Sequence, residues 1–364
     1  MSLQAPDKNA ESPLPLVSII TPCFNSSRFL GGCIESVLAQ TYPWVEHIVQ
    51  DGASTDGTAA ILHRYLGRVD WVSEPDRGQA DGLDRAIKRS HGDILLVLNA
   101  DDMLLPDAAS WAVELLAQYP TDAVIYGDLY LMDQFGCHIG ECLGPEYDFA
   151  SVLCVEKVLP AQAAFIRRSA LEQVGLWADA ALDSCPDYEM FVRLGLRFPM
   201  RHVPGFVSRY RYYARPMDGA MPRSVDRFVQ AKTCVMERVF DSCTDQDGMK
   251  ALRKRARAGL LLWASEEARG IGDLRAAFTY FAEALSQYGL FDQALATAMR
   301  IYLKSGIKSE KKLRVSPSLS RILVVGKGLV AAKFPRVRSV MRLLVSVALS
   351  VLITYLLLVW RLGR

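Results

Sequence analysis

Short apolar, β-branched segments alternate with amphipathic segments along the first hundred residues, and this pattern restricts the fold of the 364-residue chain more than any other feature. The strand-like segments are 16–22, 47–50, 70–73 and 94–98, and patterns of helical period occupy 30–38, 58–66 and 79–89. Such alternation predicts an α/β, Rossmann-like fold, a mostly parallel sheet with helices on both faces. Ligands bind these sheets beyond the carboxyl ends of the strands.

Polar and acidic residues follow each of the four strand-like segments. They are Thr21, Pro22 and Asn25 after the first, Asp51 after the second, 74–78 after the third, and 99–102 after the fourth. A single Asp-Gly or Asp-Asp pair usually marks only a turn. Three acidic clusters at one sheet edge concentrate negative charge unless a cation or a donor-rich ligand binds there, so we predict a binding site.

The segments VSIITPCFNSSRFLGGCIESVLAQTY, IVQDGASTDGT, EPDRGQADGLDRAI and GDILLVLNADDML, in this order, resemble glycosyltransferase family 2 with the GT-A fold. The resemblance covers about residues 16–215. It implies a hexosyltransferase-type enzyme that transfers a sugar from a nucleotide-sugar, a UDP-sugar being the expected donor, with inversion at the anomeric carbon.

The resemblance also implies roles at the donor site. Nucleotide-sugar binding falls to Thr21, Pro22, Asn25, Asp51, Arg77, Asn99 and Asp101, with Asp51 accepting from the base and Arg77 in the segment that lines it. Asp101 matches the last residue of the family's Asp-x-Asp motif, which binds Mg²⁺ or Mn²⁺ on the donor diphosphate, and Asp102 supports it. The first motif position is Asn99 here, which lowers the local negative charge by one and predicts weaker metal binding.

The second half of the resemblance concerns the acceptor side. Gln162 and Arg167 or Arg168 correspond to residues that face the active site, although an ordinary strand and helix explain this segment equally well. Asp187 is the expected catalytic base, since a helix N-terminus can aim a carboxylate at the acceptor hydroxyl, and Glu189 is the alternative. Pro186 replaces a commoner acidic residue, and a role for Asp187 as a mere helix cap stays open.

The segment 207–216 resembles the family's closing strand and loop, in which a His often approaches the diphosphate. The sequence here is Arg211-Tyr212-Tyr213, without that His. Arg211 or Arg215 is therefore expected to contact the diphosphate.

The remainder of the chain divides by composition. We expect a loose tail over 1–15, a GT-A domain over 16–222, a helical region similar to a tetratricopeptide pair over 223–306, and a basic, amphipathic linker over 307–342. Residues 343–360 form an uncharged run that as a helix would extend about 27 Å, close to a bilayer core of about 30 Å. Cationic residues before it predict a membrane-associated protein with a cytosolic catalytic domain, as at a bacterial inner membrane.

The net charge and the cysteine and histidine patterns limit which classes of partner and metal site the sequence predicts. A net charge of +2 argues against a nucleic-acid partner. Eight scattered cysteines without a Cys-x-x-Cys pair predict free, mostly buried thiols, and the five histidines lack zinc-site spacing. The expected acceptor is a glycan or a lipid-linked molecule.

Two alternatives to an active transferase stay open. Asn99, Pro186 and the missing His would suit a catalytically degenerate scaffold that binds a nucleotide or a glycan. A nucleotidyltransferase would need a Gly-rich phosphate loop after the first strand, where TPCFNSSRF stands instead.

Overall fold

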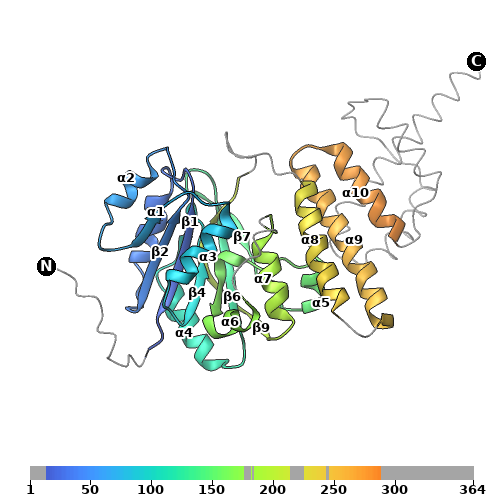
Figure 1. Cartoon of the computed structure of the whole chain (residues 1–364), viewed down its shortest axis with the longest axis horizontal. Helices are drawn as coiled ribbons and strands as arrows, with labels where there is room; N and C mark the ends of the chain where they lie inside the picture. Colours follow the sequence, from blue (N-terminus) through green and yellow to red (C-terminus); the bar gives the residue numbers. More distant parts are fainter. Residues whose placement is uncertain (1–13, 176–181, 183, 214–224, 243–245, 288–364) are drawn as a thin grey trace, which may run out of the picture. The chain divides into compact units, whose positions relative to one another are not determined.

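The structure is a computed structural model that describes residues 14–175, 182, 184–213, 225–242 and 246–287. Its first half follows the predicted alternation: β1 (Val17–Cys23), α1 (Leu30–Leu38), β2 (Val45–Asp51), α2 (Thr58–His63), β3 (Asp70–Ser73), α3 (Gln79–Arg89) and β4 (Ile94–Val97). These four strands are parallel, in the order β3-β2-β1-β4 (Figure 1). The α/β prediction is confirmed.

The second half of the sheet is mixed, where the sequence led us to expect a mostly parallel one. It contains β5 (Met103–Leu104), β6 (Val124–Met132), β7 (His138–Cys142), β8 (Ala164–Arg167) and β9 (Met200–Arg211), and the order continues β4-β8-β6-β9-β5 with β7 paired to β6. β8 is antiparallel to both β4 and β6. Antiparallel neighbours need no crossover helix, so the alternation pattern does not reveal them.

Helices cover both faces of the sheet, as predicted. Successive side chains of β1 point to opposite faces, so Ile19 packs with α1 and α4 (Ala108–Gln118), whereas Ile20 packs with α3. The second face is also covered by α6 (Arg168–Val174) and α7 (Pro186–Gly195). A short helix, α5 (Phe149–Leu153), and a 3-10 turn, η1 (Ala161–Ala163), precede β8.

Helices α8 (Val225–Asp241) and α9 (Gln246–Gly270) share the core of the second face, because buried residues of both lie in the cluster that includes α3 and α7. α9 packs so closely that a Cβ added at Gly259 would overlap the carbonyl oxygen of Cys154. The first compact unit therefore extends to Asp273 and the second begins at Leu274, with α10 (Leu274–Gln287). We expected the division at residues 222 and 223 instead.

The remaining expectations concern the cysteines, the membrane helix and the C-terminal segments, and the described residues include only some of these. None of the seven described cysteines forms a disulfide, and four of them are buried. Among the described residues, no helix is long and apolar enough to cross a membrane. The segments 288–306, 307–342 and 343–360 lie outside the described residues.

Candidate active site

The carboxyl ends of β1, β2 and β3 lie side by side. Cys23 pairs with Asp51, and Asp51 pairs with Ser73. β4 joins the same edge, because Val97 pairs with Ile20 and the chain then enters 98–102. The polar segments after all four strands therefore meet at one edge, as the sequence indicated.

Asp51 ends β2 with its side chain fully buried. Its Oδ2 accepts hydrogen bonds from Ser73 Oγ (2.6 Å) and Ser54 N (3.1 Å), and its Oδ1 accepts from Ser54 Oγ. The protein thus holds this carboxylate in place, and a nucleobase N–H that bonds to it must share oxygens with these donors.

Asn25 connects the loop after β1 to the loop after β2. Its N–H donates to Ser54 Oγ (2.7 Å), and its Oδ1 accepts from Thr55 N (3.0 Å). Nearby, burial works to raise the pKa of Asp56, but hydrogen bonds from Thr58 and Ser27 outweigh it and lower the pKa to about 2. The two loops are therefore held as one surface beside Asp51.

Thr21 does not present its side chain to a ligand, contrary to our expectation. It is fully buried, and its Oγ1 lies 2.9 Å from His47 Nε2 and 3.8 Å from Cys33 Sγ of α1. The alternation of β1 places Thr21 on the same face as Ile19, beneath α1. Pro22, on the other face, stays partly exposed.

The loop after β3 is fixed by α3. Arg85 Nη1 donates to Glu74 Oε1 (2.8 Å), and Asp81 accepts from both Arg77 N (3.1 Å) and Arg77 Nη2 (3.0 Å). The hydrogen bonds from Arg77 lower the pKa of Asp81 to about 2. The Arg77 side chain is 76% exposed, so it lies at the surface against α3.

Asp76 belongs to the polar segment 74–78 that the sequence placed at this edge, but no individual role was assigned to it. A Cβ added at Gly52 would stand 3.0 Å from Asp76 Oδ2, and one added at Gly82 would stand 3.1 Å from the same atom. Asp76 Oδ1 accepts from Gly78 N at 3.0 Å. The two glycines leave room for a carboxylate next to Asp51, and the Gly directly after Asp51 is the sequence signal that pointed to it.

The turn after β4 carries Asn99, Asp101 and Asp102. Asp102 is 1% exposed, and its oxygens accept from Arg211 N (2.8 Å) and Asn99 Nδ2 (3.2 Å). Burial, together with the charge of Asp101, raises the pKa of Asp102 well above its ordinary value. Asp102 therefore braces the turn, and Asp101 is the carboxylate presented at its surface.

Arg211, at the end of β9, is also a brace, which corrects its expected diphosphate contact. Its Nε donates to the carbonyl of Asp101 (2.9 Å) and its Nη1 to the carbonyl of Asp133 (2.7 Å). The guanidinium lies 4.3 Å from the Phe29 ring centroid, and the residue is 7% exposed. Arg215 lies outside the described residues.

Tyr213 touches the expected metal ligand directly. Its hydroxyl donates to Asp101 Oδ2 at 2.9 Å. Burial and the charge of Asp101 raise the pKa of Tyr213, so the phenol keeps the proton that it donates. Tyr213 stands in the segment where the sequence lacked a His, and this departure was the signal for a residue at the site.

α7 carries the two candidate bases. Cys185 is the N-cap residue, and Asp187 Oδ1 accepts from the first-turn N–H of Tyr188 (2.8 Å), so Asp187 makes a capping hydrogen bond without being the N-cap residue. Glu189 is bound by two hydrogen bonds of 2.7 Å from Arg193. Glu189 is thus committed to a buried ion pair, which favours Asp187.

The direction of α7 brings Asp187 toward the strand ends. β9 is parallel to β6 and begins at Met200, paired with Val124 at the amino end of β6. α7 ends five residues earlier, and its ten residues span about 15 Å. The start of the helix therefore lies nearer the carboxyl edge.

The segment around β8 divides between the two edges of the sheet. Gln162 lies in η1, directly before β8, and is partly exposed at the carboxyl edge. Because β8 is antiparallel to β4, Arg167 pairs with Ile94 at the amino edge. Arg167 Nε donates to the carbonyl of Asp122 (2.9 Å) and Arg168 Nη2 to Ser90 Oγ (2.7 Å), so neither faces the candidate site, contrary to our expectation.

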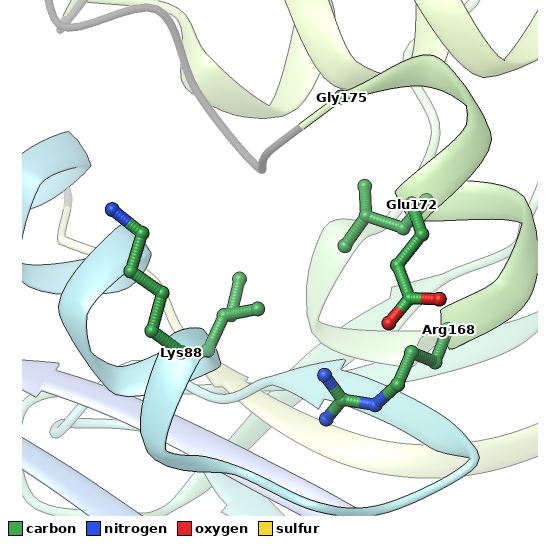
Figure 2. Close-up of a pocket in the computed structure, with 6 residues that line it drawn as sticks. Lys88, Arg168, Glu172 and Gly175 are labelled. Atoms are coloured by element: carbon green, nitrogen blue, oxygen red, sulfur yellow. The ribbon is translucent and has the colours of Figure 1, made fainter.

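A cavity of about 350 Å³ lies between α3 and α6, away from the acidic segments, lined by Ile87, Lys88, Arg168, Leu171, Glu172 and Gly175. Figure 2 shows Lys88 and Arg168 on opposite sides of it. Lys88 is near the end of α3, which leads to the amino end of β4, so this cavity is separate from the candidate active site.

Residues 18–131 match the family model described as Glycosyl transferase family 2. An uncharacterized glycosyltransferase of Mycobacterium tuberculosis (strain CDC 1551 / Oshkosh) is 33% identical over 186 residues, which are 50% of this chain and 70% of that protein. This chain belongs to glycosyl transferase family 2. The sequence resemblance is thereby confirmed.

Solved structures share the fold of this family 2 chain. S. aureus TarS 1-349 in complex with UDP has a TM-score of 0.56 at 15% identity, covering 80% of this chain and 87% of that one. The mannosyltransferase PcManGT from Pyrobaculum calidifontis, in complex with GDP-Man and Mn²⁺, has a TM-score of 0.54 at 20% identity, covering 93% and 86%. At these identities the similarity shows the fold alone.

The residues of the family 2 site are compatible with a divalent cation held mainly by its substrate. Within the described ranges, no group of three or more His, Cys, Asp or Glu side chains could enclose a metal. Asp101 is half-buried and receives its hydrogen bond on Oδ2 from Tyr213. Mg²⁺ and Mn²⁺ are commonly bound by one or two carboxylates together with phosphate oxygens, and Asp101 fits that pattern.

Proposed function

We propose that this family 2 glycosyltransferase transfers a hexose from a nucleoside diphosphate-sugar, with a UDP-sugar as the first candidate, to a glycan or lipid-linked acceptor, with inversion at the anomeric carbon. The observation that carries the proposal is the position of Asp101. Its carboxylate stands at the sheet edge where the loops after β1, β2 and β3 meet, and Tyr213 and the Arg211 brace hold it there.

Each end of the donor has residues suited to it. At the base end, the partly exposed Asp76 carboxylate next to Gly52 would accept from the N–H groups of a nucleobase. The fully buried Asp51 would do so only after its hydrogen bonds from Ser54 and Ser73 open. Asp101 is the residue that would hold Mg²⁺ or Mn²⁺, and such a cation, when bound, supplies positive charge for the diphosphate. Tyr213, with its proton retained, offers a neutral hydrogen-bond donor at the same end.

Asp187 serves as the base in the proposed reaction. The acceptor oxygen forms a bond to the anomeric carbon while Asp187 takes the hydroxyl proton. The bond from that carbon to the diphosphate oxygen breaks, and its electron pair leaves with the nucleoside diphosphate. Attack from the side opposite the leaving group gives inversion.

We also propose that the chain is held at a membrane, with its catalytic part in the cytosol, as at a bacterial inner membrane. The support is the uncharged run over 343–360 and the cationic residues before it, Lys333, Arg336, Arg338 and Arg342. Such attachment would suit a lipid-linked acceptor.

Calorimetry tests the donor assignment. UDP, GDP, TDP and CMP are titrated into the full chain with Mn²⁺ and again with a chelator, and the sugar-nucleotide of the binding base is then assayed for transfer. We expect metal-dependent binding of one diphosphate, followed by turnover. Binding without turnover against any donor would replace the transferase with a degenerate scaffold, and no binding at all would refute the proposal.

A further inference from the structure

A lysine of α8 is buried next to the helix that carries the proposed base. Lys232 is 8% exposed, and its Nζ lies 4.1 Å from the ring centroid of Tyr188 on α7 and 4.9 Å from that of Trp263 on α9. Burying an ammonium group is costly unless other groups compensate for the lost water. The two ring faces provide part of that compensation.

Tyr188 connects this lysine to Asp187. Its main-chain N–H donates to Asp187 Oδ1 at 2.8 Å, and its hydroxyl donates to the carbonyl of Leu153 at 2.7 Å. The ammonium group of Lys232 lies over its ring. Tyr188 is thus fixed through its backbone, its hydroxyl and its ring, and the first turn of α7 is fixed with it.

Several ionisable groups near Lys232 affect its pKa, but they do not all carry a free charge near neutral pH. Burial lowers its pKa, whereas Asp187, then Cys185, and then Glu267 of α9 act to raise it. Burial raises the pKa of Cys185 to about 12, so that group is an uncharged thiol near neutral pH. Glu189, the other acid in this turn, is matched by Arg193. Among the acids of α7, Asp187 is therefore the one whose charge favours the ammonium form of Lys232.

We propose that Lys232 is a positioning residue for catalysis: its ammonium, held between Tyr188 and Trp263, fixes the first turn of α7 and the carboxylate of Asp187 toward the acceptor hydroxyl. The inference rests on the proposed function, in which Asp187 is the base. It also gives α8 and α9 a task in the reaction, although they lie outside the region matched by the family model.

The test compares Lys232→Met, which keeps the length of the apolar stem, with Lys232→Arg, which keeps a cation able to stack on rings. The exposed Lys88, replaced by Met, is the matched control for loss of one charge. Turnover is measured as release of nucleoside diphosphate from UDP-, GDP- and TDP-sugars with water as the acceptor. Calorimetry with UDP and Mn²⁺ gives donor-site binding separately.

We expect Lys232→Met to lower kcat by about tenfold to a hundredfold, the range seen when a reacting group is displaced by about 1 Å. Donor KM and UDP affinity should stay within about twofold, because the loops after β1 to β4 are untouched. Lys232→Arg should recover most of the loss, and Lys88→Met should match the wild type. Unchanged kcat in Lys232→Met would overturn the inference.

Hydrogen exchange and additional variants distinguish failure of this inference from misfolding and from failure of the proposed function. Hydrogen exchange of the amides of residues 187–190 should become faster in Lys232→Met but not in Lys232→Arg. Equal exchange in all three proteins counts against the inference without any substrate. If Lys232→Met does not fold, Lys232→Gln takes its place, and failure of both to fold would make the role structural only. An active Asp187→Asn variant would instead refute the proposed base.

Discussion

The hydroxyl of Tyr213 donates a 2.9 Å hydrogen bond to Oδ2 of Asp101, joining residues that are 112 positions apart. The same two segments are joined again where Arg211 donates to the carbonyl of Asp101 and to Oδ1 of Asp102. The turn after β4 is therefore held by the end of β9. The position of the proposed cation ligand depends on both parts of the sheet.

Asp101→Asn should abolish the metal dependence of nucleotide binding. The amide removes the charge that a divalent cation requires while keeping the shape of the side chain, so UDP affinity with Mn²⁺ should fall to its value in chelator, a loss of about tenfold or more. Tyr213→Phe, which removes the hydrogen bond to Asp101 but leaves the Asp101 charge, should weaken UDP binding but keep its metal dependence. Calorimetry measures both, and wild-type metal dependence in Asp101→Asn would exclude Asp101 as the ligand.

Asp187→Asn should lower turnover and leave stability nearly unchanged, whereas Glu189→Gln should lower stability and leave turnover nearly unchanged. Loss of the base should lower kcat by about a hundredfold to ten-thousandfold with little change in stability. Loss of the Glu189 charge removes the ion pair of the half-buried Arg193, which still donates to the carbonyls of Val174 and Gly175, and should cost about 1 to 2 kcal/mol of unfolding free energy, with turnover retained in the folded fraction. Turnover assays and urea unfolding of both variants check this. The reverse result would make Glu189 the base.

Arg211→Met should destabilise the protein by about 3 kcal/mol. The change removes donors from the carbonyls of Asp101 and Asp133 and the cation from the Phe29 ring. Arg209, exposed on the same strand, provides the control, and Arg209→Met should stay within about 0.5 kcal/mol of the wild type. Equal unfolding free energies in urea would show that Arg211 is no brace.

His47 should make stability depend on pH. Burial lowers its pKa to about 3, whereas an unfolded His titrates near about 6.5. The unfolded chain then binds the proton first, so this contribution is fully present above pH 6.5 and is lost as the pH falls toward 3. Below about pH 6 the wild type should lose about 1.4 kcal/mol per pH unit relative to His47→Gln.

Urea unfolding between pH 7.5 and pH 4.5 measures the two slopes for His47. His63→Gln, at an exposed histidine, is measured in parallel as the comparison for removal of one histidine. Parallel slopes for wild type and His47→Gln would mean that His47 takes up its proton equally in the folded and unfolded states, which would contradict the lowered pKa.

Removal of residues 336–364 should release the protein from membranes. The deletion takes away the uncharged run over 343–360 and the cationic residues Arg336, Arg338 and Arg342. Fractionation of cells that express either form measures the effect, and the truncated form should be found in the supernatant. A full-length chain that is already soluble without detergent would contradict membrane attachment.

Local patterns were enough to predict the first half of the fold. The strands β1 to β4 and their helices appear within a few residues of the expected ranges, because each has a clear period and ends at a turn residue. The meeting of Asp51 and Asp101 at one edge followed from the parallel direction of those strands. The fully buried Thr21 could also have been recognised, since it alternates with Val17 and Ile19.

The second half depends on contacts between distant segments, which a single sequence does not reveal. Arg167 or Arg168 was expected at the site, with an ordinary strand and helix as an equal alternative, because the direction of β8 was unknown. The antiparallel strand puts both residues at the opposite edge. We expected Arg211 to bind phosphate, but its side chain donates to the carbonyl groups of Asp101, after β4, and Asp133, after β6. The contact of Tyr213 with Asp101 was missed for the same reason.

α7, α8 and α9 share one core, so the part of this chain that folds together is longer than the part that matches the family. The family match ends at residue 131, whereas one continuous apolar interior extends to α9. A protein cut at residue 222 would keep every motif of the donor site, yet it would expose the side chains of α7 that α8 now covers. The shortest piece that can be purified and crystallised is therefore set by the helical extension and not by the catalytic motifs.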